Sequence, residues 1–222
     1  MLIDMFKSSF NIGTIICIHL LSGILTGQVT AVKYFIKHND QTGLYDCHVI
    51  ITEGNAKNIS GRTQFNAQYS IVVPTGSQVK IVEKYMPLQD HQNYTGKIPC
   101  EWRIASVIKS PEAMKEKDFY GIVPTLGPSA QYNDLNAGDT IKLFSIEVDP
   151  LPAKRNDVRL FENNTDPTSS ASGMRGANFA NGFTIGGVLQ RYTGNFYPMS
   201  PLQQINVENA KNKDLKQKNK GS

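Results

Sequence analysis

The side chains that could perform chemistry are few and scattered along this chain of 222 residues. The histidines that follow the apolar N-terminal run, His38, His48 and His91, lack the close spacing that brings two imidazoles to one metal ion. No Gly-x-Ser-x-Gly elbow, glycine-rich phosphate loop or Cys-x-x-Cys pair occurs. The pattern therefore predicts a protein that is not an enzyme and has neither a catalytic residue nor a cofactor. A polysaccharide hydrolase is a lesser alternative, because two facing carboxylates can come from distant positions.

Oxygen-bearing side chains gather between Phe161 and Phe183, in a segment without an evident helix or strand. Long segments of this kind are often functional or disordered, but Phe179 and Phe183 can anchor this one, so we expect an ordered surface loop. Calcium binds six to eight oxygens, several of them from carboxylates. The candidate calcium ligands are Glu162, Asn164 and Asp166. Only two of them are carboxylates and no Asp-x-Asp spacing occurs, so we favour a structural role over calcium binding. A recognition loop is the other functional interpretation.

Aromatic residues near turns and strand ends are candidates for sugar binding, because flat sugar faces stack on aromatic rings. These residues are Tyr85, Tyr94, Tyr120, Tyr132, Tyr192, Phe196 and Tyr197. The alternative is that the tyrosines pack at the sheet edges with their hydroxyl groups in water. We expect Trp102 in the core, because it is in register with Ile104.

Cysteine usage leaves the redox state open. Cleavage of an N-terminal signal removes Cys17 and leaves Cys47 and Cys100, both in predicted strands. An exported chain with two cysteines can form one disulfide. Two buried free thiols are an equally good interpretation.

The N-terminal segment is predicted to be a secretory signal peptide over residues 1–27. Lys7 precedes an apolar run over residues 12–25, and Leu25-Thr26-Gly27 is an acceptable cleavage site, so the mature chain begins near Gln28. A membrane anchor is the alternative, but the run is shorter than the roughly 20 apolar residues of a spanning helix. We therefore predict a secreted or cell-surface protein with no membrane span in the mature chain.

Charge is concentrated at the C-terminal end. The chain has a net charge of +4, and five lysines against two acidic residues fall between Glu208 and Ser222. A nearly neutral folded body lacks the basic surface of a nucleic-acid-binding protein. Residues 196–222 are predicted to be a polar, Lys-rich, disordered tail.

Hydrophobic residues recur with a period of two, which is typical of half-buried strands. One face of a strand carries Phe65, Ala67, Tyr69, Ile71 and Val73. Similar runs begin near residues 32, 45, 79, 102, 141, 158 and 183. About eight or nine short strands separated by turn signals predict an all-β fold, a single antiparallel β-sandwich over residues 28–195. One short helix is expected from Ser110, with Pro111 at its first position, ending by about Asp118.

A resemblance to a known family is carried by residues 69–77, 85–89, 92–96, 101–104, 139–148 and 158–187. These segments resemble a module of secreted surface proteins of Bacteroidetes-type bacteria. The resemblance spans Val29 to Asn195, and its general layout is similar to cohesin-like and carbohydrate-binding-like sandwiches. The resemblance implies an extracellular location and carries over no functional residue. Larger members also have a C-terminal sorting domain, which the Lys-rich tail replaces here.

The function expected from these observations is structural or adhesive, at the cell surface or in the extracellular matrix. The expected partners are other copies of the chain, or surface polysaccharide or protein. Residues 28–38 are strand-like, so they could exchange between copies and promote self-assembly through strand edges. A carbohydrate-binding module is the alternative function.

Overall fold

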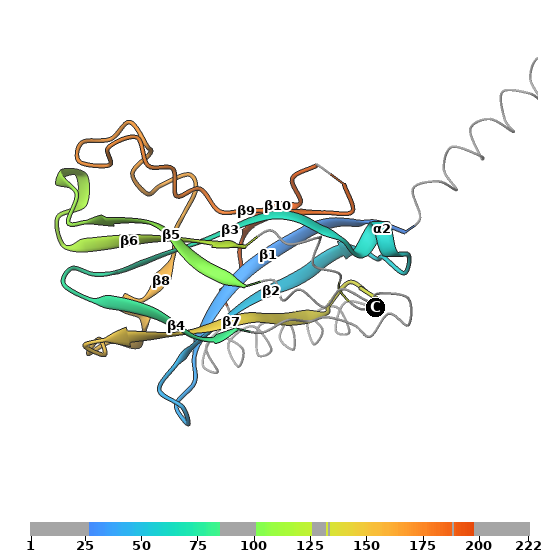
Figure 1. Ribbon diagram of the computed structural model, residues 1–222, viewed down its shortest axis with the longest axis horizontal. Coiled ribbons are helices and arrows are strands. Elements are labelled where there is room, and N and C mark those ends of the chain that lie inside the picture. Colours follow the sequence, from blue (N-terminus) through green and yellow to red (C-terminus); the bar gives the residue numbers. More distant parts are fainter. Residues whose placement is uncertain (1–26, 85–100, 126–131, 133, 188, 198–222) are drawn as a thin grey trace, which may run out of the picture.

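The computed structural model describes residues 27–84, 101–125, 132, 134–187 and 189–197. Within them, the strands show the alternating burial that the sequence predicts. In strand β2 (Tyr45–Gly54), Tyr45, Cys47, Val49 and Ile51 are buried while the residues between them are partly exposed. Ten strands of the described residues form two sheets (Figure 1). The predicted all-β, sandwich-like fold is confirmed.

The first sheet has the strand order β10-β1-β2-β7-β4. Besides β2, its strands are β1 (Val29–His38), β4 (Gln78–Lys84), β7 (Thr140–Asp149) and β10 (Tyr192–Asn195). Neighbours pair antiparallel except β1 and β10, which are parallel. The predicted sandwich was purely antiparallel, and this pair departs from it because alternation carries no information on the direction of a neighbouring strand.

The second sheet has the order β5-β6-β3-β8, and β9 also pairs with β3. Its strands are β3 (Gln64–Pro74), β5 (Trp102–Lys109), β6 (Lys117–Pro124), β8 (Arg159–Leu160) and β9 (Gly182–Ile185). The predicted inward face of β3 holds from Ala67 to Val73, but Phe65 is exposed. The register shift between Gln64 and Asn66 explains why Phe65 leaves the alternation.

One core joins the inner faces of the two sheets. Tyr34 of the first sheet packs 4.6 Å from Tyr69 of the second, measured between ring centroids. Trp102 is buried, as predicted, and its ring lies 4.9 Å from that of Phe144. These contacts cross from sheet to sheet and therefore fix the distance between them.

The helical elements differ from the prediction. The segment after Ser110 makes only a single 3-10 turn, η1 (Glu112–Met114), because β6 begins at Lys117. A second turn, η2 (Arg155–Asp157), precedes β8. A one-turn helix that the sequence analysis missed, α2 (Ile59–Arg62), starts at Asn58, whose side chain accepts a hydrogen bond from the backbone N–H of Gly61.

Strand β1 lies inside the first sheet. It pairs with β2 on one side and with β10 on the other. Both edges of the strand are therefore engaged within one chain, on the β10 side at Val32 and Tyr34, and the exchange of residues 28–38 between copies stays a prediction.

A second, smaller core holds the loop between β8 and β9. Phe161, Met174 and Phe179 pack on Val72 of β3 and Phe119 of β6. The predicted anchors both hold, since Phe179 is buried here and Phe183 is buried in the main core. In Figure 1 the loop, drawn in orange, lies beside the β5–β6 end of the second sheet.

Candidate functional site

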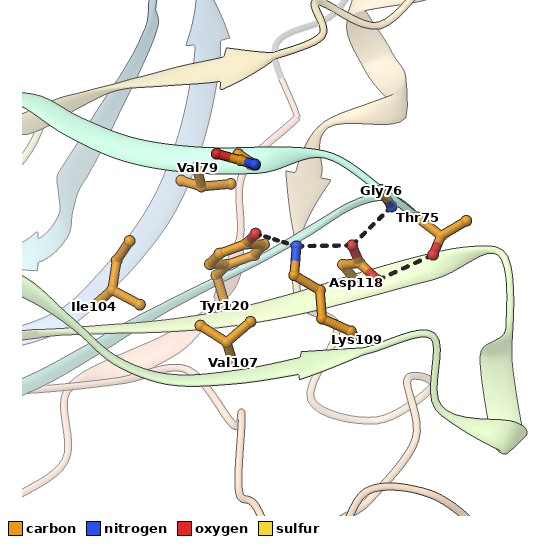
Figure 2. A pocket seen from close by; sticks show the side chains of 9 residues that line it. Thr75, Gly76, Val79, Ile104, Val107, Lys109, Asp118 and Tyr120 are labelled. Carbon is orange, nitrogen blue, oxygen red and sulfur yellow. Dashed lines mark hydrogen bonds and ion pairs between the residues drawn. The ribbon is translucent and has the colours of Figure 1, made fainter.

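The candidate site is a pocket of about 630 Å³ on the side where the edge strands β4 and β5 face each other. Val79, Ile104 and Val107 form its apolar wall, as Figure 2 shows. Lys109 and Asp118 stand at its polar end, beside the turn that joins β3 to β4. We refer to it as the edge pocket.

Asp118 is the centre of the polar end. Its side chain is fully buried and accepts hydrogen bonds from the backbone N–H of Gly76 at 3.0 Å and of Ser110 at 2.8 Å. It also accepts a bond from Thr75 Oγ1 at 3.2 Å and one from Lys109 Nζ at 3.0 Å. The carboxylate thus ties the β3–β4 turn to the end of β5.

Lys109 is saturated as a donor. Its ammonium group donates to Asp118, to the Ser77 carbonyl at 2.6 Å and to the Tyr120 hydroxyl at 2.5 Å. Tyr120 in turn donates to the Ser77 carbonyl at 2.8 Å. Burial acts to lower the pKa of Lys109, but the hydrogen bonds with Tyr120 and Asp118 outweigh it and raise that pKa above its ordinary value.

This electrostatic arrangement has a direct chemical consequence. An ammonium group with a raised pKa stays protonated, so Lys109 has no lone pair for nucleophilic or base catalysis. Its three N–H bonds already have acceptors within the protein. The polar end of the edge pocket therefore stabilises the fold by holding the β3–β4 turn against β5 and β6. The apolar wall is the part that can contact another molecule.

A second charged cluster lies on β2, β4 and β7. Lys142 Nζ is 2.7 Å from Asp46 and 2.9 Å from Glu83, and Ser145 Oγ lies within hydrogen-bonding distance of both carboxylates. Burial acts to raise the pKa of Asp46, but Lys142 and Ser145 outweigh it and lower that pKa. Asp46 therefore stays ionised and lacks the raised pKa of a glycosidase acid.

The calcium candidates lie at the base of the loop. Asp166 is buried and makes a bidentate ion pair with Arg159, at 2.6 and 2.7 Å, and accepts the backbone N–H of Glu162 at 2.7 Å. Asn164 is exposed. The guanidinium group occupies the carboxylate face that a calcium ion would need, which favours the structural role. Within the described residues, no three His, Cys, Asp or Glu side chains are grouped to hold a metal ion.

The tyrosine candidates that the structure describes do not form one exposed row. Tyr120 and Tyr132 are buried, so neither can stack on a sugar. Tyr192 packs against Tyr34 at 5.0 Å, and burial raises its pKa to about 12. Tyr197 is 58% exposed, next to Phe196. The remaining candidates, Tyr85 and Tyr94, lie outside the described residues.

Cys47 is fully buried between the sheets, and burial raises the pKa of its thiol above the ordinary value. Cys100 lies outside the described residues, so the disulfide stays a prediction. The same holds for the signal peptide over residues 1–27 and for the tail beyond residue 197.

A second depression, of about 250 Å³, lies where the loop meets β3 and β9, and we call it the amide pocket. Its polar side chains are mostly amides: Asn66, Gln68, Asn178, Asn181 and Gln190. This group of amides was not predicted from the sequence. Asn66 and Gln68 were visible as the polar face of a strand, but their partners are more than a hundred residues away in the chain.

Comparison with protein-family models, curated proteins and solved structures finds no match. The resemblance to a Bacteroidetes surface module therefore stays a prediction. Among the helices of the described residues, none has the length and apolar character to cross a membrane.

Proposed function

We propose that this protein is a non-catalytic adhesive protein that works outside the cytoplasm. The observation that carries the proposal is the loop between β8 and β9, which is ordered although it contains no regular element beyond turns. Ordering an irregular loop costs conformational entropy, and here a dedicated apolar core offsets that cost. Ordered surface loops on a rigid scaffold are a common means of recognition.

The base of the loop is secured by polar contacts as well. Asn181 Oδ1 accepts the backbone N–H of Ser70 at 2.6 Å, and Asn181 Nδ2 donates to the Phe161 carbonyl at 2.8 Å. Together with the Arg159–Asp166 ion pair, these bonds hold both ends of the loop on the second sheet. A loop held in this way loses little further entropy when it binds, which favours affinity.

The charged clusters support a non-catalytic role. Lys109 and Lys142 both have raised pKa values, and the pKa of Asp46 is lowered. These shifts stabilise ionised pairs and do not prepare an acid, a base or a nucleophile at neutral pH. The extracytoplasmic location rests on the apolar run over residues 12–25 and on the resemblance to surface modules.

The test uses beads coated with the full chain. We expect the beads to cluster with one another or to be retained on surfaces coated with polysaccharide or extracellular protein. Phe179→Ala, which removes a loop anchor, should reduce adhesion, while Leu151→Ala, at an exposed position outside the loop, should not. Coated beads that neither cluster nor are retained on any surface would refute the proposal.

A further inference from the structure

We propose that the amide pocket binds a neutral, hydroxyl-rich ligand, a single sugar unit of a carbohydrate. This inference rests on the proposed adhesive function and names its ligand class. It is carried by the chemistry of the pocket lining and by the orientation of three of its amides, Gln190, Asn178 and Gln68.

Two of the amides present a donor. Gln190 Oε1 accepts the backbone N–H groups of Phe183 at 2.5 Å and of Tyr192 at 3.1 Å, so the NH₂ end of Gln190 is turned the other way. Gly182 makes room for it, since a Cβ there would lie 2.6 Å from Gln190 Nε2. Asn178 is oriented similarly, because its Oδ1 accepts the backbone N–H of Ala180 at 2.9 Å.

A third amide presents an acceptor. Gln68 Nε2 donates to the Asn178 carbonyl at 2.8 Å and to Ser70 Oγ at 3.3 Å, which leaves Gln68 Oε1 as the available end. The hydrogen-bond network thus determines which end is available in each of these three amides. Sugar hydroxyl groups both donate and accept, so neighbouring hydroxyls match donors and acceptors placed side by side.

The lining also selects against charge. None of the residues that line the amide pocket is Lys, Arg, Asp or Glu. An ionised ligand would lose hydration there without gaining an opposite charge. The volume of about 250 Å³ is smaller than the roughly 300–1,000 Å³ of pockets for drug-sized ligands. A single neutral ring is therefore the best fit in both charge and size.

An extended peptide is a poorer fit, because the backbone of β9 beside the pocket is already engaged. The N–H of Phe183 donates to Gln190 Oε1, and its carbonyl accepts the backbone N–H of Arg191 at 2.8 Å. Thr184 also forms a bridge with Gln190. A peptide that adds to a sheet needs an open edge, and this edge is occupied.

The experiment titrates the ¹⁵N-labelled full chain with glucose, galactose, mannose and N-acetylglucosamine, up to about 50 mM to cover millimolar affinities. Glucuronate and an uncharged pentapeptide serve as comparison ligands. Backbone and side-chain amide signals are followed by NMR. We expect saturable shifts at Gly182, Gln190 and Asn178 with at least one neutral sugar.

Two isosteric variants test the assignment. Gln190→Glu and Asn178→Asp keep the oxygen that binds the backbone N–H groups and replace only the NH₂ group. Each should weaken sugar binding about tenfold or more, as expected when a polar contact loses its partner. Gln41→Ala, in the β1–β2 turn, is the matched control and should bind normally.

Three results would overturn the inference: no shift in the amide pocket with any of the four sugars, undiminished binding by both variants, or tighter binding of glucuronate or the peptide. If the sugars fail while coated beads still adhere, the ligand class is wrong and the adhesive function stands.

Discussion

Replacing Asp118 with alanine should destabilise the whole sandwich, because this buried carboxylate connects the β3–β4 turn to strands β5 and β6. The substitution removes the acceptor of two backbone N–H groups, those of Gly76 and Ser110. A hydrogen bond to a charged group contributes about 1.5–3 kcal/mol, so the two bonds together contribute about 3–6 kcal/mol. We expect Asp118→Ala to lower the free energy of unfolding by about that amount.

The ion pair between Lys109 and Asp118 should contribute less to the free energy of unfolding than the two backbone hydrogen bonds do. The Lys109 side chain is 48% exposed, so water can replace its ammonium group. Only the lysine side of this pair is exposed, since Asp118 is fully buried, so Lys109→Met should cost about 1–2 kcal/mol, less than Asp118→Ala. Asp118→Asn keeps the shape and one acceptor, so its cost should be intermediate, about 2–3 kcal/mol.

Urea denaturation followed by fluorescence can measure these differences. The chain has one tryptophan, Trp102, which is buried in β5 next to β6 and will report its exposure on unfolding. The reasoning is refuted if Asp118→Ala costs less than about 1 kcal/mol, which is the range of ordinary surface substitutions. It is also refuted if Lys109→Met costs as much as Asp118→Ala, since the ammonium group would then dominate.

Three further predictions concern a histidine and the loop. Burial lowers the pKa of His48 in the folded protein below its ordinary value of 6.5, so folding favours the neutral imidazole. The free energy of unfolding that this contributes should be complete above pH 6.5 and should be lost as the pH falls through the lowered pKa. His48→Gln should remove this pH dependence in urea titrations between pH 5 and 8. Phe179→Ala should cost about 3–5 kcal/mol and expose the loop to proteases; an unchanged cleavage rate would contradict the anchoring role. Gly173 and Gly176 both have positive φ, but only at Gly173 would a Cβ meet backbone, 2.4 Å from Glu112 N. Gly173→Ala should therefore lower the free energy of unfolding by at least about 1 kcal/mol more than Gly176→Ala does, as measured by urea denaturation. Equal costs of the two substitutions would contradict the close approach at Gly173.

Strands with one exposed face were predictable from the sequence, whereas strand β6 was not. In β6, residues 118–122 are all buried, because β5 and β3 flank it and the loop covers its outer face. A strand that is buried on both faces shows no alternation. The position of Asp118 within this apolar run was the one sequence feature that indicated a buried polar group. Its partners lie in other strands and turns, so the sequence did not show which residues it binds.

The candidate ligands were predictable only by residue type. Asp166 was correctly placed in the functional-looking loop, but its carboxylate binds Arg159. Tyr120 and Tyr132 were candidates for an exposed sugar-binding surface and are buried. Tyr120 lies within β6, whose residues 118–122 are all buried, and the ring of Tyr132 packs 6.2 Å from that of Phe183 in the main core. A single sequence does not reveal which aromatic rings will be covered by residues far away in the chain.

The sequence by itself determined the all-β character and the inward-facing residues of the two sheets, because side-chain alternation is a local pattern. It also determined the anchoring of the loop by Phe179 and Phe183, because these aromatic residues stand out in an otherwise polar segment. Only the tertiary structure decided the sheet order, the parallel β1–β10 pair and the two pockets. Each of these depends on residues far apart in the chain, such as Gln68 and Gln190, that become neighbours only when the sheets are assembled.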